Sequence, residues 1–264
     1  MADETTRAET TATLARELMR LHQEPALLTV VNVWDAITTR VVAAVEGTRA
    51  IATSSHAIAV TLGYEDGEKI PLDLHLEMIQ RIVAATDLPV TADLEGGYGN
   101  APETIRRAIG LGVVGANIED QLKPITEAAR QVEAIMKVAD DEGVDFVLNA
   151  RTDAYHLGRQ RDRETNMLDA LERGRAYLDA GAPTVFVPAI LDDDDVQRLV
   201  DAFGPQRLTL IGIPGLPSPA RMEELGVARL SYGPISQNVA LTALQDMAMG
   251  AQRGEVAPEF RMLN

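Results

Sequence analysis

The sequence has no cysteine, a single tryptophan and no apolar tract long enough to span a membrane, which takes about 18 or more residues. Without cysteine, the chain can form neither disulfides nor thiolate metal ligands, and it has no cysteine nucleophile. Its N-terminal segment lacks the basic region and apolar core of a signal peptide. We therefore expect a cytoplasmic protein with no membrane partner.

Positive charge is also scarce, since 24 Lys and Arg face 40 Asp and Glu for a formal net charge of −16. Such a surface repels phosphate backbones and anionic lipid, so nucleic acid is not an expected partner. A small anionic substrate would need a local positive element, such as a metal ion, an arginine or backbone N–H groups. The 264 residues, 46% of them hydrophobic, suffice for one well-filled core, and we expect a single domain over 1–264.

Short strand-like runs alternate with segments of helical period along the chain. The predicted strands span 27–33, 49–54, 89–94, 113–119, 145–151, 184–188, 207–213 and 227–232. The predicted helices span about 5–23, 37–46, 72–85, 102–111, 125–142, 162–180, 192–203, 219–225 and 234–250, with a helical C-terminal tail over about 234–264. Eight strand–helix units in series favour an α/β fold of the (β/α)8 TIM-barrel type, and an open doubly wound sheet is the alternative.

Acidic residues collect where two neighbouring predicted strands end. Asp93 and Glu95 are two positions apart, so in a strand their side chains point the same way, and Glu119 ends the next strand. Three converging carboxylates repel one another unless a cation lies among them, and oxygen ligands suit Mg²⁺, or Mn²⁺, better than zinc. The alternative is that they are helix caps and solvated loop residues. The glycines that follow, in DLEGGYGN, would let the loop bend beside the ion.

Other strand ends carry groups suited to an anion. The second predicted strand ends in Thr53, Ser54 and Ser55. This turn offers successive N–H and hydroxyl groups to a carboxylate or phosphonate, although an ordinary capping turn explains it equally well. Arg151 either pairs with an acid such as Glu119 or Asp153 or grips an oxyanion, and these roles are compatible. Asn117 is a further candidate at a strand end. His56 lies close to the turn, whereas His75 is expected on a helix surface.

Five motifs occur in a series over about 25–240: NVWDAITTRVV, ATSSHAIAVTLGYEDGE, DLEGGYGN, GANIED and NARTDAY. Together they resemble the isocitrate lyase and phosphoenolpyruvate mutase superfamily, in particular its short bacterial phosphonomutase-like members. The resemblance implies a (β/α)8 barrel whose last helix is swapped between subunits, and hence a homodimer or homotetramer.

The resemblance also implies roles for residues of this chain. The acids matching Asp93, Glu95 and Glu119 hold Mg²⁺, partly through water, and the arginine matching Arg151 binds substrate and stabilises negative charge. The turn at 53–55 holds the substrate carboxylate, Trp34 lines the pocket, and Asp66 lies on a mobile segment that closes over the site. Arg151, Asp66 and His56 are the catalytic candidates, and Trp34, Thr53, Ser54, Ser55, Asn117 and Arg151 the substrate-binding candidates.

Two departures narrow the chemistry. The lyases of this superfamily carry a Lys-Lys/Arg-Cys-Gly-His loop after the fourth strand, whereas here EDQLKPITEAARQVEAI passes directly into a helix. Pro188 occupies the place of a histidine near the end of the sixth strand, and no asparagine stands on the shortened loop. Isocitrate cleavage and phosphonomutase activity by the usual routes are therefore not expected. The general acid or base is open among His56, Tyr64, Tyr98, Lys123 and a metal-bound water.

The sequence thus predicts a Mg²⁺-dependent lyase or mutase-like enzyme. It would act on a small α-keto acid or carboxylate and break a C–C or P–C bond through an enolate-like intermediate. The alternatives are an aldol-type transferase acting on a 2-keto acid and a non-catalytic relative that binds a metabolite.

Overall fold

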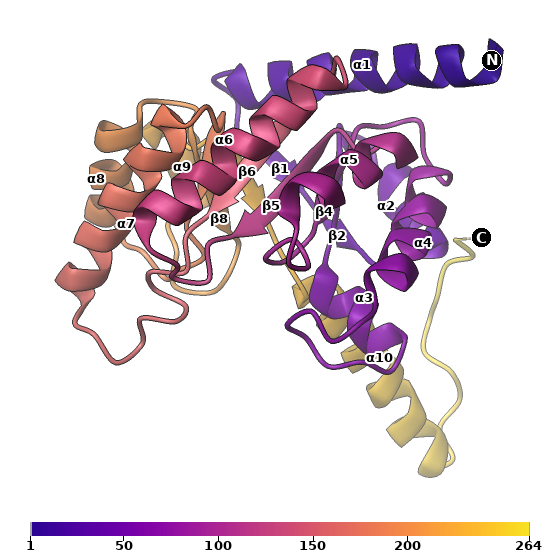
Figure 1. Cartoon of the computed structure of the whole chain (residues 1–264). Helices are drawn as coiled ribbons and strands as arrows, with labels where there is room; N and C mark the ends of the chain where they lie inside the picture. The colour runs from indigo at the N-terminus through magenta and orange to yellow at the C-terminus, as the bar shows by residue number, and fades with distance from the viewer. Residues whose placement is uncertain (1, 264) are drawn as a thin grey trace.

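Within residues 2–263, which the computed structural model describes, nine short parallel strands form one sheet (Figure 1). The strands are β1 Leu28–Val30, β2 Asn32–Val33, β3 Ile51–Thr53, β4 Val90–Asp93, β5 Gly115–Glu119, β6 Val147–Arg151, β7 Thr184–Phe186, β8 Leu208–Ile211 and β9 Arg229–Ser231. Strand β1 pairs with β9, and β2 pairs with β3. Because Val31 alone separates β1 from β2, they form one interrupted barrel position, and the predicted (β/α)8 barrel is confirmed.

Helices alternate with the strands and surround them. They are α1 Ala2–Gln23, α2 Ala36–Ala43, α3 Ser55–Thr61, α4 Leu72–Val83, α5 Ala101–Leu111, α6 Ile125–Asp141, α7 Arg163–Asp179, α8 Asp193–Phe203, α9 Pro219–Leu225 and α10 Ile235–Gln252. Local chemistry sets their ends: the Asn100 side chain accepts from the N–H of Glu103 at the start of α5, and Gly112 ends it at φ 98°. Short α3 was not predicted; the Ser54 hydroxyl caps it by accepting from the N–H of Ala57.

The barrel interior closes against α1 at its N-terminal end. Gly115 begins β5 there, and a Cβ at this position would lie 2.8 Å from the carbonyl oxygen of Val147 and 2.9 Å from Leu18 Cδ2. A glycine therefore lets α1 pack directly against the strands. Residues 1 and 264 of the expected domain lie outside the described residues.

Helix α10 and the segment after it extend away from the barrel, as Figure 1 shows in yellow. The first turn is anchored by Gln237, whose amide donates to the carbonyl of Ala57. Farther along, Val239 and Leu244 are 65% and 58% exposed. The helix ends at Gln252, and residues 253–263 are not helical as the expected tail would be. Such an apolar face suits a helix swapped between subunits, and the homodimer or homotetramer stays a prediction.

No helix in the described part of the chain combines the length and apolar character needed to cross a membrane.

Candidate active site

A cavity of about 540 Å³ lies at the C-terminal ends of the strands. It is lined by most of the residues predicted from the sequence, namely Ser54, Ser55, His56, Asp66, Asp93, Glu95, Asn117, Glu119 and Arg151. They come from separate strands and loops, and the parallel barrel brings them to one rim because all its strands point the same way. These predicted site residues at the strand ends therefore lie around one cavity, as expected.

Two predicted substrate-binding residues do not line this cavity. Thr53 is 1% exposed, and its hydroxyl accepts from the backbone N–H of Asp93. Trp34 packs against the hydrophobic core, and its backbone N–H donates to Thr38 at the start of α2. In this structure both residues support the strand ends.

Asp93 is held at the end of β4 by the neighbouring turn. One carboxylate oxygen accepts from the Ser55 hydroxyl at 2.8 Å and from the Ser55 N–H at 3.2 Å. The other oxygen, Oδ1, is buried and has no hydrogen-bond partner. A buried acceptor without a partner is costly, so Asp93 is suited to a ligand that approaches from the cavity. Ser55, predicted to hold the substrate, here holds a carboxylate of the protein itself.

Glu95 belongs to a hydrogen-bonded chain that leads away from the cavity. Its carboxylate accepts from the Tyr98 hydroxyl at 3.0 Å and from the N–H of Glu68. The Tyr98 hydroxyl also lies 2.8 Å from Nδ1 of His75, which is fully buried and not on the helix surface as expected. The glycine before Tyr98 is needed: Gly97 has φ 92°, and a Cβ there would lie 2.3 Å from that of Ala101.

Glu119 and Arg151 face each other at the ends of β5 and β6, where they are paired in register. Arg151 Nη1 donates to Glu119 at 2.5 Å and its Nε donates to an Asp153 oxygen at 2.9 Å, while Nη2 lies 2.7 Å from the same oxygen as an ion pair. These contacts engage all three guanidinium nitrogens and leave at least two of the five N–H groups for an anionic ligand. Arg151 thus combines the two compatible roles expected for it.

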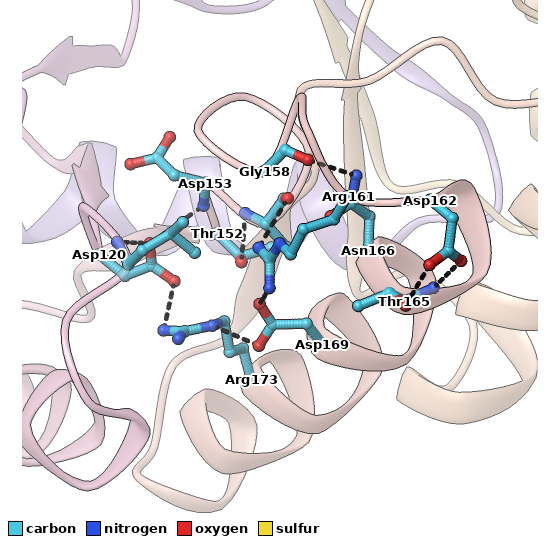
Figure 2. A network of polar contacts seen from close by, with 12 residues as sticks. Asp120, Thr152, Asp153, Gly158, Arg161, Asp162, Thr165, Asn166, Asp169 and Arg173 are labelled. Carbon is cyan, nitrogen blue, oxygen red and sulfur yellow. Dashed lines mark hydrogen bonds and ion pairs between the residues drawn. The ribbon is translucent and has the colours of Figure 1, made fainter.

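A buried polar network surrounds Asp120, and Figure 2 shows Asp120 with Asp153 and Arg173. Asp120 accepts from the N–H of Asp153 at 3.0 Å, from Arg173 Nη1 at 3.2 Å and from the Tyr177 hydroxyl at 2.5 Å. We call Asp120, Asp153, Arg173 and Tyr177 the Asp120 network. It anchors the segments that follow β5 and β6 to helix α7. Because every member is buried and hydrogen-bonded, the network holds the Arg151 guanidinium in one orientation.

Burial changes the protonation of two acids at the rim. Loss of solvent raises the pKa of Glu95 to about 7, against the opposing effect of the Glu68 N–H. Loss of solvent also raises the pKa of Glu119 to about 8, although Arg151 opposes it. Neighbouring carboxylates, including Asp93, add to both shifts. Near neutral pH the acidic rim therefore holds protons that a cation could displace.

Asp66 and His56 also line the cavity. His56 Nδ1 is 3.3 Å from an Asp66 oxygen, and the two side chains are 42% and 53% exposed. The segment of Asp66 is attached to the loop after β4 two residues farther on, because the carboxylate of Glu68 accepts from the N–H of Tyr98 at 2.6 Å. The expected covering segment is thus joined to the loop after β4, and its catalytic role stays a prediction.

Sequence reasoning missed several lining residues. Asp153 was considered only as an ion-pair partner, and His156, in the loop after β6, was not considered for the site at all. Phe186 and Ile211 were not considered, and Pro188 was considered only as the residue in the place of a histidine; the three form an apolar wall at the ends of β7 and β8. Each lies at or just beyond a strand end, so barrel geometry was the available signal, but an apolar side chain at such an end looks like core. Lys123 contacts Gln131 and does not line the cavity.

The metal prediction is neither confirmed nor excluded by the geometry. Among the described residues, no group of three or more histidine or acidic side chains is arranged to hold a metal ion. Asp93 turns to Ser55, Glu95 to Tyr98 and Glu119 to Arg151. The chemistry nevertheless fits a hard dication, because all the donors are oxygens and Asp93 Oδ1 is buried without a partner.

Comparison with known proteins agrees with this architecture. The family model described as phosphoenolpyruvate phosphomutase matches residues 18–251. An oxaloacetate decarboxylase of Chromohalobacter salexigens is 31% identical over 238 residues, which cover 87% of this chain and 82% of that protein. An uncharacterized protein of Mycobacterium tuberculosis, Rv1998c, is 30% identical over 240 residues, 90% of each chain.

Solved structures share the fold of this chain. A protein of Burkholderia cenocepacia J2315 named as a candidate phosphonomutase is 36% identical, with a TM-score of 0.83, over 92% of this chain and 99% of that one. The 2,3-dimethylmalate lyase of the PEP mutase/isocitrate lyase superfamily is 21% identical, with a TM-score of 0.82, and shares the fold over 95% of this chain and 92% of its own. The chain therefore belongs to the phosphoenolpyruvate phosphomutase family.

Proposed function

We propose that the chain is a divalent-metal-dependent lyase that decarboxylates a small 2-keto acid of the oxaloacetate type. The observation that carries the proposal is the convergence of Arg151, Asp93, Glu95 and Glu119 on one cavity. Relatives of 29–31% identity are named oxaloacetate decarboxylases, which supports the reaction class. The bond broken would be C3–C4: carbon dioxide leaves, the electron pair enters the C2–C3 enolate, and a proton is taken up at C3.

The chain's own residues would bind and orient the head of the substrate. Arg151 lines the cavity and has at least two N–H groups that the protein does not use. There they would pair with the keto acid head and stabilise the charge that develops on the enolate oxygen. The Asp120 network prevents the guanidinium from turning away. Ser54 and Ser55 close the adjacent wall of the cavity.

Asp93, Glu95 and Glu119 would hold Mg²⁺ or Mn²⁺, directly or through water. When bound, such an ion supplies Lewis acidity toward the carboxylate and keto oxygens. The three acids contribute the negative charge that attracts the ion, and the raised pKa values of Glu95 and Glu119 mean that protons must leave as it binds.

The short segment after β5 favours decarboxylation over cleavage of a hydroxy acid, because it replaces the loop that carries the lyase acid in the superfamily. Cleavage of a 2-hydroxy acid begins with removal of a hydroxyl proton, whereas loss of carbon dioxide from a 3-carboxylate needs no proton removal. The segment after β5 turns directly into α6 and brings no acid or base of the lyase loop to the cavity. Authentic phosphonate chemistry is disfavoured by the same short segment, so C–C cleavage is the better-supported reaction.

The test is pyruvate formation from oxaloacetate, coupled to lactate dehydrogenase, with Mg²⁺ or Mn²⁺ and then with EDTA. Because divalent ions decarboxylate oxaloacetate slowly by themselves, each rate is corrected for the same solution without protein. Arg151→Met should lower kcat/KM by about 100-fold or more, the usual effect of removing a group that stabilises an oxyanion. Arg130→Met, an exposed arginine of α6 outside the cavity, is the matched control.

The outcomes separate the alternatives. Turnover that requires metal and Arg151 supports the proposal. Metal-dependent oxalate binding without turnover of any keto acid would indicate the non-catalytic relative, and product formation only when an aldehyde is added would indicate the transferase.

A further inference from the structure

The cavity has two chemically different halves. From β3 to β6 its wall is polar, with Ser54, Asp93, Glu119 and Arg151 among the lining residues. From β7 to β8 the wall consists of Phe186, Pro188 and Ile211. The change is abrupt, because Glu119, Arg151 and Phe186 occupy one register row across three neighbouring strands. Whatever binds at Arg151 therefore meets apolar surface on the adjacent side.

The charge of the lining does not favour an anionic group at the far end of the ligand, beyond an oxaloacetate-type head. Among the described residues that line the cavity, Arg151 is the only arginine or lysine, against the five acids Asp66, Asp93, Glu95, Glu119 and Asp153. Two of those acids already engage the guanidinium. His156 lines the rim, but loss of solvent and the charge of Arg151 lower its pKa, so it is neutral near pH 7. A remote carboxylate or phosphate against the apolar wall would find no cation.

Two large apolar side chains are exposed at the same end of the barrel, one at the mouth of the cavity and one two residues after Pro188. Leu157 lines the mouth and is 54% exposed, and Ile190, in the loop after β7, is 61% exposed. Ile190 also borders Gly215 in the loop after β8, where an added Cβ would lie 3.1 Å from its Cγ2. Large apolar side chains that are exposed beside a binding cavity are typical of a surface that contacts a ligand.

The volume leaves room for such a contact. Cavities of about 300–1,000 Å³ enclose ligands of drug size, and this one measures about 540 Å³. A bare keto acid head at Arg151 would leave the space beside Phe186 and Ile211 to water. Apolar surface against water is unfavourable, so an apolar ligand group is the better occupant.

We propose that the substrate carries an alkyl substituent beyond its 2-keto carboxylate head and that Phe186, Pro188 and Ile211 bind it. The substrate class is thus a branched or longer-chain 2-keto acid, such as a 3-alkyl-substituted oxaloacetate, in preference to unsubstituted oxaloacetate. This inference rests on the proposed function for the position of the head and concerns the other half of the same cavity.

Binding of 2-keto acids that have no carboxylate at C3, and so cannot be decarboxylated there, tests the inference without turnover. Pyruvate, 2-oxobutanoate, 2-oxopentanoate and 2-oxoglutarate are titrated by calorimetry with Mg²⁺ present. Each added methylene should tighten Kd by about fourfold, which corresponds to about 0.8 kcal/mol for a buried CH₂. The dicarboxylate 2-oxoglutarate should bind more weakly than 2-oxopentanoate, the monocarboxylate with the same main-chain length. Equal Kd values across the alkyl series, or tighter binding of the dicarboxylate, would overturn the inference.

A charge introduced into the wall should reverse the preference. Ile211→Arg should weaken 2-oxopentanoate binding about tenfold or more, as expected for burying an unpaired charge beside an alkyl group, and should improve 2-oxoglutarate binding. Leu168→Arg, at an exposed leucine of α7 outside the cavity, is the control and should change neither. If Ile211→Arg does not fold, the wild-type series still decides. Oxalate has no alkyl group and therefore separates the two proposals. If oxalate binds but Kd is the same for pyruvate, 2-oxobutanoate and 2-oxopentanoate, only this inference fails and the proposed function stands.

Discussion

The two halves of the barrel rim differ in the support of their side chains as well as in polarity. In the polar half, Asp93 and Arg151 are each fixed by at least two hydrogen bonds, and the buried Asp120 network supports Arg151. In the apolar half, Phe186 and Ile211 are placed by strand register and packing alone. Directional bonds fix orientation, whereas apolar packing fixes mainly shape and volume.

This difference indicates that the polar half carries out the chemistry and the apolar half selects the substrate. Chemistry that depends on the position of charge requires groups held within a narrow geometry, and the polar half provides that. Selection of a substituent by size needs only a wall of suitable shape, and such a wall can change without disturbing the charged groups. We therefore expect substitutions in the polar half to change kcat and those in the apolar half to change mainly which substrate binds.

The largest effect is expected for Asp93→Ala. The change removes the carboxylate with the unpartnered buried oxygen, and we expect metal-dependent binding of oxalate to fall by about 100-fold or more, since metal ligands contribute at this scale. Calorimetry with and without EDTA measures it. Asp87→Ala, an exposed aspartate before the same strand, is the control. Tight oxalate binding by Asp93→Ala in EDTA would contradict the metal site.

The sequence could predict which residues meet at the rim because all strands of a parallel barrel end on the same side. Asp93, Glu119 and Arg151 each end an apolar run, so one rule placed all three at the same rim, and the structure has them there. The interruption of the first strand at Val31 left no signal, because valine is an ordinary strand residue and nothing in the sequence marks a break there. Helix α3 begins at the Ser54 cap. The sequence indicates a capping turn at 53–55 as an alternative to an anion-binding turn, but it does not predict the helix that the cap starts.

The hydrogen-bond partners of the site residues could not be predicted in the same way. Asp93 binds Ser55, from a strand end 38 residues away in sequence, and nothing in either motif fixes which of several nearby donors it selects. His75 was assigned to a helix surface beside Asp73 and Glu77. Its spacing from Ile79 and Ile82 places it on the buried face of α4, so helical periodicity could have found it.

A smaller but still substantial effect is expected for Arg173→Met, which tests the support of the polar half. The change leaves Asp120 buried with one partner fewer, and we expect the free energy of unfolding to fall by about 3 kcal/mol, as when a buried ion pair loses one member. If the Asp120 network orients Arg151, kcat should fall about tenfold with KM nearly constant. Denaturant unfolding and steady-state kinetics measure both, and loss of stability with an unchanged kcat would show that the network is purely structural.

The protons of the acidic rim should make metal affinity depend on pH. Glu95 and Glu119 have pKa values of about 7 and about 8, so a bound ion must displace their protons at lower pH. Affinity for Mn²⁺ should therefore rise with pH up to about 8 and level off above it, with a slope of up to about tenfold per pH unit for each proton released. Titration in two buffers of different ionisation enthalpy counts these protons. Glu119→Gln should remove about one, and an unchanged count would exclude Glu119 as a ligand.

The smallest effect on chemistry is expected for Phe186→Leu, in the apolar half. The substitution keeps an apolar side chain and removes some volume, so the free energy of unfolding should fall by about 1 kcal/mol. Turnover of unsubstituted oxaloacetate should stay within about twofold of the wild type, because no polar group moves. The Kd of 2-oxopentanoate should rise by about threefold, since part of its alkyl contact is lost. A fall in kcat comparable to that of Arg151→Met would show that the two halves are one catalytic unit, because a wall that only selects a substituent has no charge to contribute to the transition state.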